Sequence, residues 1–418
     1  MSSYFVNPSL LSITKIHNRG SNAESVLNQN RRLILQLIKD SGVISRKTLT
    51  EKTGLKLATI TLAIKALLEK GLIEEVGLIK GDSGRKIMGF SMSHIKYCVI
   101  TLRMSTSYLK IGAYNLNNEN LYIKTIFFDT LSDINHTCDV IVNEINQVEP
   151  HIKDRILIGI GLGVEGPFVI KDGYYKLPDN QSPEGYFDIG KVLNQKLGVP
   201  ILINRQTNFA VYELWKREGK NNPSGIYVHI SVSYTVECGI MVNGEIINGS
   251  RGTAGLLGNI TIGQDNLGNP VTLQDEASST AVIDKVRILL KKYPYSILTL
   301  KKDDLNIRDV IRAFTLEDDL AISIFTDVGI HLGRAVANLV NIFNPDYIFI
   351  GDELPTTVKM KNIIEYEAKK HLPKEVDPNL HPVILDYEVA RDAKRDQSLL
   401  GGSSYIVDAF IQSMDFYN

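Results

Sequence analysis

The chain has 418 residues, of which 44% are hydrophobic and 22% are charged, with 46 Lys and Arg against 47 Asp and Glu. This length is too great for one ordinary core and predicts about three domains, and the composition is that of a globular protein. No run reaches the roughly 18 apolar residues that span a bilayer, and the N-terminus lacks the pattern of a signal peptide, so we expect a cytoplasmic protein.

Charge is distributed unevenly along the chain. Residues 1–95 contain 14 Lys and Arg against 7 Asp and Glu, whereas the remaining residues contain 32 against 40. A basic N-terminal part therefore precedes an acidic body. Because the neutralisation of DNA phosphates requires a concentrated patch of cations, only the N-terminal part is a candidate for nucleic-acid binding.

The N-terminal part begins with a polar, irregular stretch over residues 1–20, for which we expect a flexible arm. The apolar spacing that follows predicts a helix over 23–40, ended by Ser41 and Gly42. The predicted buried stripe of this helix consists of Leu27, Ile34, Leu37 and Ile38.

The segment from Ser45 to Gly71 has the pattern of a helix-turn-helix. Ser45 suits the N-cap of a short helix that runs through Thr53, and Gly54 supplies the tight turn into the next helix. That next helix is the recognition-helix candidate, and its predicted core-facing stripe consists of Ile60, Ile64, Leu67 and Leu68.

A short β-hairpin is predicted after the third helix. The segments "LIEEV" (72–76) and "KIMGFSM" (86–92) are apolar enough to pair, and residues 77–85 form a Gly- and Lys-rich tip. Helix-turn-helix, wing and positive charge together predict DNA binding. Two alternatives are a protein-interaction module and a surface that is simply solvated.

The candidate DNA-contacting residues come from three places. Ser45 and Arg46 are expected to hold the DNA backbone, and Arg85 and Lys86 at the wing are expected to contact phosphates or a minor groove. Leu57 and Leu62 on the outward side of the recognition helix would contact thymine methyl groups or pack against the wing or the arm. The recognition-helix candidates are Lys56, Leu57, Thr59 and Thr61.

From about residue 96 onward, strand and helix patterns alternate. Three successive strand patterns precede a helix over 133–148, and a buried strand then enters a Gly-rich turn. A second such series ends in a long amphipathic helix over 319–345 and an apolar strand over 347–353. Three strands followed by helix–strand alternation, occurring twice, predict two similar α/β lobes with a cleft between them.

The three cysteines, Cys98, Cys138 and Cys238, are widely separated and lie in apolar settings. We interpret them as small buried hydrophobic residues. Their spacing indicates neither a disulfide framework nor a zinc cluster.

These patterns resemble the ROK family, which includes repressors and sugar kinases. The resemblance covers nearly the whole chain: "ISRKTLTEKTGLKLATI" and "GDSGRK" in the N-terminal part, and residues 159–173, 197–219, 239–260 and 329–353 in the body. It implies an α/β architecture in which an N-terminal winged helix-turn-helix, as in the family's xylose repressors, precedes a two-lobed actin-like, sugar-kinase-like (ribonuclease H-like) domain.

The chain departs from the family's kinases at their catalytic positions. The kinases place a general-base Asp directly after an Asn, whereas Arg205 follows Asn204 here, and a guanidinium does not give up its proton at workable pH. The family's first phosphate turn, Asp-x-Gly-Gly-Thr, corresponds to residues 103–115, which lack that Asp. The second corresponds to "SYTVEC" (233–238), whose bulky side chains block close backbone approach. We therefore expect no ATP binding and no catalytic residue.

The family's sugar and zinc positions differ in the same way. Leu256 and Asn259 stand where the family commonly has a sugar-binding Glu and a His, and residues 263–278 lack the three zinc-site cysteines, so we expect no metal and no cofactor. Arg205 favours an anionic effector such as a phosphorylated or acidic sugar, unless it pairs internally with an acid such as Glu165. The candidate effector-binding residues are Glu165, Asp179, Asn180, Asn204, Arg205, Asn259 and Gln274.

The resemblance thus implies a sequence-specific DNA-binding regulator of the repressor type, with an ATP-dependent sugar kinase as the alternative. Its expected partners are an operator in double-stranded DNA, a sugar or sugar-phosphate effector, and further copies of the chain in a homodimer or tetramer. The expected domains are a flexible arm (1–20), a winged helix-turn-helix (21–92), lobe 1 (93–205), lobe 2 (206–390) and a C-terminal helix that packs back on lobe 1 (391–418).

Overall fold

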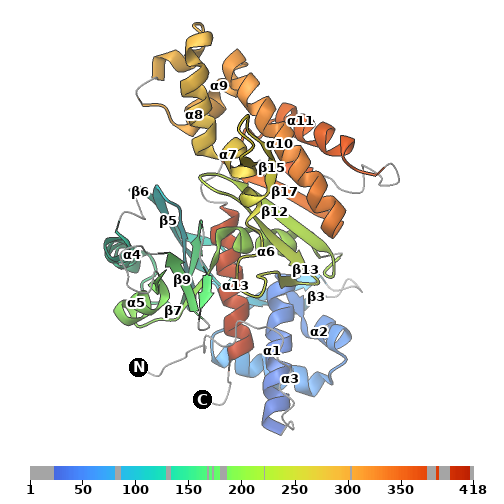
Figure 1. Ribbon diagram of the computed structural model, residues 1–418. Coiled ribbons are helices and arrows are strands. Elements are labelled where there is room, and N and C mark those ends of the chain that lie inside the picture. Colours follow the sequence, from blue (N-terminus) through green and yellow to red (C-terminus); the bar gives the residue numbers. More distant parts are fainter. Residues whose placement is uncertain are drawn as a thin grey trace.

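The computed structural model places a small N-terminal head, comprising the elements from α1 to β3, beside a two-lobed body that contains all later elements (Figure 1). The residues that the structure describes are 23–80, 86–128, 133–166, 169–171, 174–178, 186–220, 222–301, 304–373, 383–385 and 396–414.

The head is a winged helix-turn-helix, as predicted. Its three helices are α1 (Ala23–Ser41), α2 (Arg46–Thr53) and α3 (Leu57–Glu69). They pack on an antiparallel sheet whose strands lie in the order β1 (Ile44–Ser45), β3 (Lys86–Met92) and β2 (Ile73–Lys80).

Local signals explain where α2 begins and ends. The Ser45 hydroxyl accepts a hydrogen bond from the backbone N–H of Thr48 at 3.1 Å, which caps the helix. Gly54 ends α2 in the left-handed region, with φ at 70°, and donates its N–H to the carbonyl of Thr50. The core beneath these turns is built from Ile34, Leu35, Ile38, Leu49, Ile60, Ile64, Leu67 and Phe90.

The predicted stripe of α1 is partly wrong. Leu27 is 39% exposed, and Leu35 is fully buried in its stead together with Ile34 and Ile38. The reason is that α1 is covered by α3 and β3 and also by the C-terminal helix of the body, so its buried surface extends around the helix beyond one stripe.

Lobe 1 is built on a five-stranded sheet. In chain order, the first three strands of this sheet pair antiparallel with one another. The fourth strand runs parallel to the first, and the fifth runs parallel to the fourth. Helices α4 (Ile134–Val148) and α5 (Ile189–Leu197) share one hydrophobic cluster with this sheet. The strand order is β11 (Ile201–Arg205), β7 (Ile156–Val164), β4 (Tyr97–Met104), β5 (Tyr108–Asn115) and β6 (Asn120–Phe127).

Lobe 2 repeats this plan. The order of its sheet is β14 (Glu245–Ile246), β13 (Val236–Val242), β12 (Ile226–Val232), β17 (Tyr347–Asp352) and β18 (Val383–Leu385). Numbered along the chain within each lobe, both sheets have the order 3-2-1-4-5, which confirms the prediction of two similar α/β lobes.

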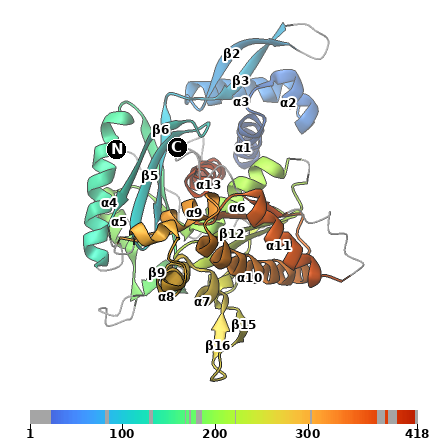
Figure 2. The same ribbon diagram turned by 90° about the horizontal axis from the view of Figure 1, so that it is seen from above.

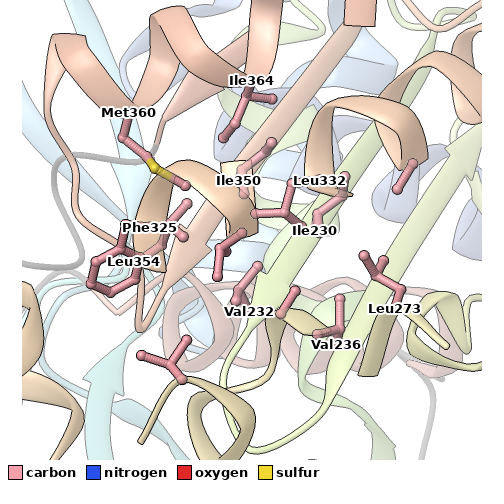
Figure 3. Close-up of a cluster of buried hydrophobic side chains, with 14 of the residues drawn as sticks. Ile230, Val232, Val236, Leu273, Phe325, Leu332, Ile350, Leu354, Met360 and Ile364 are labelled. Atoms are coloured by element: carbon pink, nitrogen blue, oxygen red, sulfur yellow. The ribbon is translucent and has the colours of Figure 1, made fainter. Parts of the chain in front are cut away.

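The hydrophobic core of lobe 2 lies between its sheet and a group of helices. These helices are α7 (Leu273–Ala277), α8 (Ser279–Leu289), α9 (Ile307–Thr315), α10 (Asp319–Phe343) and α11 (Val358–Lys370). Figure 3 shows side chains of this core, among them Ile230, Val232, Val236, Leu273, Phe325, Leu332, Ile350, Leu354, Met360 and Ile364.

The remaining elements are short. In Figure 2 the hairpin of β15 (Thr261–Gln264) and β16 (Pro270–Thr272) projects from lobe 2, away from the head. The others are β8 (Val169–Lys171), β9 (Tyr174–Pro178), β10 (Tyr186–Phe187) and the 3-10 turns at Glu149–His151, Leu257–Asn259, Leu290–Lys292 and Ile297–Lys301.

Two helices join the lobes to each other. Helix α6 (Gln206–Glu218) follows the last strand of lobe 1 and packs against β12 and β13 of lobe 2. Helix α13 (Gln397–Ser413) follows lobe 2 and packs against β4 and β7 of lobe 1. The two helices also pack closely on each other, and α13 continues down to α1 of the head (Figure 1). The expected domain boundaries stay a prediction.

Within the described part of the chain, one helix has the length and apolar composition needed to cross a membrane. It is α10, and 61% of its most apolar 18-residue window is buried inside the protein. The core helix of a globular lobe passes the same test. Figure 1 shows α10 beside α11, and α10 shares one hydrophobic cluster with Ile348 and Ile350 of β17.

The contact between α6 and α13 depends on Gly401. A Cβ at this position would overlap the backbone carbonyl of Phe209. We predict that Gly401→Ala destabilises the protein by about 1–3 kcal/mol or more, because overpacking outweighs the roughly 1 kcal/mol that Ala gains over Gly in a helix. The apparent thermal unfolding midpoint of the full chain measures this effect.

Gly263→Ala is the matched control, since a Cβ there meets no atom within 4 Å. An unchanged midpoint for Gly401→Ala would show that α6 and α13 are less closely packed than described.

Candidate functional site

The exposed side of α3 lies opposite the core of the head. Leu57 and Leu62 are 58% and 64% exposed, Lys56 and Thr61 are also exposed, and Thr59 is half-buried. The predicted outward orientation of these residues is therefore observed. A helix that presents one free side in this way can enter the major groove of DNA, and the contacts themselves stay a prediction.

A groove runs beside the start of α3. Its volume is about 490 Å³, and it separates α3 from the start of α2 and from β3. Leu57 lines this groove and so lies beside the wing while it remains exposed. The other lining residues are Ser45, Arg46, Lys47, Thr50, Glu51, Ile87 and Met88.

Ser45 and Arg46 differ in whether their side chains are accessible to DNA. Ser45 is buried, and its hydroxyl is already engaged in capping α2. The Arg46 guanidinium lies over the ring of Phe90, 4.7 Å from its centroid, and 3.9 Å from the Glu75 carboxylate. The Phe90 ring and the Glu75 carboxylate thus hold Arg46 in place at the edge of the groove, where a phosphate could reach its guanidinium.

The head carries exposed lysines on α2, at the start of α3, further along α3 and on the wing. The exposed lysines of the head among the described residues include Lys47, Lys52, Lys56, Lys65 and Lys86. Lys86 is the first residue of β3, whereas Arg85 lies outside the described residues. A concentration of cations on one side of a winged helix is the electrostatic pattern expected of a DNA interface.

The second candidate site lies between the lobes. Parallel pairing of β7 and β11 sets Arg205 in register with Val164, so Glu165 and Arg205 emerge at the same edge of the lobe 1 sheet. Glu237 of β13 meets this edge from lobe 2, and its carboxylate accepts a hydrogen bond from the N–H of Gly166 at 3.1 Å. Three ionisable side chains from two lobes therefore gather in one place.

Glu165 ties the two lobes together. It is 3% exposed, and its carboxylate accepts hydrogen bonds from the hydroxyls of Ser105 in lobe 1 and Ser233 in lobe 2. It also accepts from the N–H of Thr235 at 3.2 Å. These partners lie in the turn after β4 and in the turn between β12 and β13, so one carboxylate holds a turn of each lobe together.

Arg205 is fully buried at the start of α6. Its Nη1 donates to the carbonyl of Ala254 at 2.7 Å, and Asn204 beside it accepts from the Asn208 side chain at 2.8 Å. Glu237 is an acidic neighbour of Arg205 that the sequence did not single out. The guanidinium is therefore part of the packed interior in this conformation.

The remaining predicted effector residues are placed less centrally. Gln274 accepts from the N–H of Val236 at 2.8 Å and donates to the carbonyl of Tyr234, so it supports the turn that Glu165 also binds. Asn259 is exposed. Asp179 and Asn180 lie outside the described residues.

Arg103 is a further site residue that the sequence reasoning missed. Its guanidinium is buried at the end of β4 and donates to Asp352 of lobe 2 at 2.7 Å, to Asp396 at 3.2 Å, and to the side chain of Gln206. Lys110 also pairs with Asp396, at 2.9 Å. An isolated charge within an apolar strand, as in "YCVITLRM" and "TVECGIMV", is the sequence signal that points to Arg103 and Glu237.

Asp352 is held in a strained backbone conformation, with φ at 74°. Its carboxylate accepts hydrogen bonds from Ser231 and from Arg103, which together fix the end of β17. The space left among these side chains is about 10 Å³, lined by Arg103, Gln206, His229, Asp352 and others. That volume holds about one water molecule.

Burial dominates the titration of this region. Desolvation raises the pKa of Glu237 to about 8, although Arg205 and the Gly166 N–H act in the opposite direction. Desolvation also lowers the pKa of His229 to about 4. Desolvation opposes the charged form of Asp396, but Arg103 and Lys110 outweigh it and hold its pKa below the ordinary range.

The chain matches known proteins along nearly its whole length. The model of the ROK family matches residues 99–409, and a model of winged helix-turn-helix DNA-binding domains matches residues 27–74. The xylose repressor of Bacillus subtilis is 23% identical over 391 residues, which cover 91% of this chain and 96% of that protein. The DNA-binding transcriptional dual regulator NagC of Escherichia coli is 25% identical over 348 residues, which cover 81% and 84%.

A solved structure has the same fold. It is the crystal structure of a ROK family transcriptional regulator, a homolog of the Escherichia coli MLC protein, and it superposes with a TM-score of 0.72 at 23% identity. The match covers 94% of this chain and 98% of that one. The head and the two lobes thus occur together, in this order, in another protein.

The raised pKa of Glu237 makes stability depend on pH. Its carboxyl group has an ordinary pKa of 4.5 when the chain is unfolded and about 8 when it is folded, so its contribution is complete below about pH 4.5 and is lost as the pH rises to 8. We predict that the wild type loses stability relative to Glu237→Gln over this range, by about 1.4 kcal/mol for each unit of pKa difference. Thermal unfolding midpoints of both proteins between pH 5 and 8 measure this.

Glu245→Gln serves as the control, because Glu245 is exposed on the neighbouring strand β14. If the difference between wild type and Glu237→Gln does not change with pH, Glu237 is ionised in the folded protein and its described environment is wrong.

Proposed function

Because the chain belongs to the ROK family and carries a winged helix-turn-helix DNA-binding domain at its N-terminus, we propose that it is a cytoplasmic transcriptional repressor that binds operator DNA through α3. The observation that carries this proposal is the exposed side of α3, which begins at the exposed Lys56 and lies beside a groove lined by Arg46, Lys47 and the wing strand β3. The xylose repressor and NagC to which it is similar are regulators by name.

We propose a homodimer on a pseudo-palindromic operator. A single recognition helix buries little surface on DNA, whereas two heads related by a two-fold axis double the contacts and fix the spacing of half-sites. Lys56, Thr59 and Thr61 would contact bases or phosphates, with Arg46, Arg85 and Lys86 on the backbone or in the minor groove. The exposed methyl groups of Leu57 and Leu62 suit thymine methyls.

We further propose that the body has no catalytic activity. Arg205 occupies the position of the kinases' general base, and Glu165 ties together the two turns that correspond to their phosphate turns. Each of these contacts argues against a sugar kinase.

The effector is proposed to bind when the lobes part. Glu165, Asn204, Gln274 and Asn259 offer the hydrogen-bond donors and acceptors that suit a polyol, with Asp179 and Asn180 as further candidates. The positive charge of Arg205 favours an anionic sugar.

The DNA proposal is tested by Lys56→Ala. Because Lys56 is exposed at the start of α3, losing one phosphate contact should weaken binding to all sequences and reduce the slope of log affinity against log salt by about 0.9. The measurement is a gel-shift or anisotropy titration of the full chain against genomic fragments at several salt concentrations.

Lys191→Ala is the matched control, since Lys191 is an exposed lysine on α5 of lobe 1, outside the head. Binding that is neither sequence-selective nor salt-sensitive in the wild type would overturn the proposal that this chain is a DNA-binding regulator.

The effector proposal is tested by thermal shift with neutral, acidic and phosphorylated sugars. A ligand that binds the native state raises its melting temperature, and we predict the largest rise for an anionic sugar. Arg205→Met should abolish the preference for the anionic ligand. Stabilisation by neutral sugars alone would contradict a role for Arg205 in effector recognition.

A further inference from the structure

The head is attached to the body through a specific set of polar contacts. Arg32 of α1 donates from Nε and Nη2 to the carbonyl of Met414, at 3.0 and 2.6 Å, just after α13 ends. Lys39, two turns further along α1, donates to the carbonyl of Ser404 at 3.1 Å. One side of α1 is therefore hydrogen-bonded to the middle of α13 and to the residue that follows it.

Asp408 of α13 is the centre of this junction. Its carboxylate is paired with Lys39 of the head at 2.8 Å and with Lys216 of α6 at 3.2 Å. It also accepts hydrogen bonds from the side chains of Gln36 and Tyr212. Four donors from two helices, α1 and α6, thus converge on one carboxylate whose side chain is 12% exposed.

The contacts of Asp408 favour one arrangement of α1, α6 and α13. Burial opposes the ionised form of Asp408, but Lys39 and Lys216 outweigh burial and lower its pKa to about 2. The carboxylate is therefore charged at neutral pH, and a buried charge keeps its donors only in one arrangement of the helices. Lys216 strengthens this arrangement because it also pairs with Asp40 of α1, at 3.1 Å.

The two helices that hold the head begin at the interlobe site. Helix α6 starts next to Arg205, and helix α13 is capped by Asp396, the partner of Arg103 and Lys110. At 1.5 Å per residue the 17 residues of α13 span about 25 Å. The pair of helices therefore connects the cleft to Asp408 as one packed unit (Figure 1).

We propose that Asp408 is a positioning residue for operator recognition, which fixes the orientation of the DNA-binding head on the body through Lys39 and Lys216. In a dimer held together by its bodies, this orientation sets the distance between the two recognition helices. The inference rests on the proposed homodimer and adds to it a named residue on which half-site spacing depends.

The test uses the full chain and DNA selected from a random library for binding to the wild type. Affinity is then measured for a single half-site and for paired half-sites at a series of spacings. We predict that the wild type prefers one spacing and that Asp408→Asn reduces this preference by about tenfold, within the usual range of coupling between sites, while single half-site affinity is unchanged. Asp408→Glu should restore part of the preference.

Asp284→Asn is the matched control, because Asp284 forms an exposed ion pair with Arg287 on α8. Lys39→Met removes the partner of Asp408 on the head, and it replaces Asp408→Asn in the test if that variant does not fold. Failure of the wild type to bind a half-site contradicts the proposed function itself. Half-site binding with a spacing preference that both Asp408→Asn and Lys39→Met retain overturns only the positioning role.

Discussion

The packing of α6 against α13 is the constraint on which the rest of the structure depends. Each helix follows one lobe in the chain and covers the sheet of the other lobe, and both helices share one hydrophobic cluster with the head and with strands of both lobes. The absence of a side chain at Gly401 lets the backbones approach closely. Because the same two helices reach the head, the DNA-binding surface and the interlobe site are parts of one packed unit.

Several charged side chains of the body lie inside the molecule. Arg103, Glu165 and Asp352 are all buried or nearly so, and each takes part in a contact between the two lobes. Isolated charges would not tolerate this burial, whereas hydrogen-bonded pairs do, at the cost of allowing few arrangements. The consequence is a cleft filled by its own side chains, in contrast to α2 and the recognition helix α3, where Lys47, Lys52, Lys56 and Lys65 remain in solvent.

The sequence predicts the head well because its signals are local. The Ser45 cap, the left-handed Gly54 and the apolar spacing of α3 each act within a few residues, and the structure has all three. Leu27 was misplaced because the packing of α1 against α13 joins distant parts of the chain. The repeated lobe pattern was also readable, since strand and helix periodicities recur in the same order.

The interlobe site was only partly predictable. Asn204, Arg205 and Glu165 stand out because they end strands or depart from a known pattern, and β7 and β11 bring them to one edge. Arg103 joins Asp352 and Asp396 across 249 and 293 residues, and no local pattern encodes such a pairing. Asp408 is missed for the same reason, because its partners come from α1 and α6.

The central claim is that DNA contacts the free side of α3 and the wing. It is tested most directly by photocrosslinking the full chain to its selected DNA, in which thymines are replaced by 5-iodouracil, followed by identification of the attached peptides. The account predicts attachment within residues 46–62 or along β2 and β3. Attachment confined to the body, with none in the head, would contradict it.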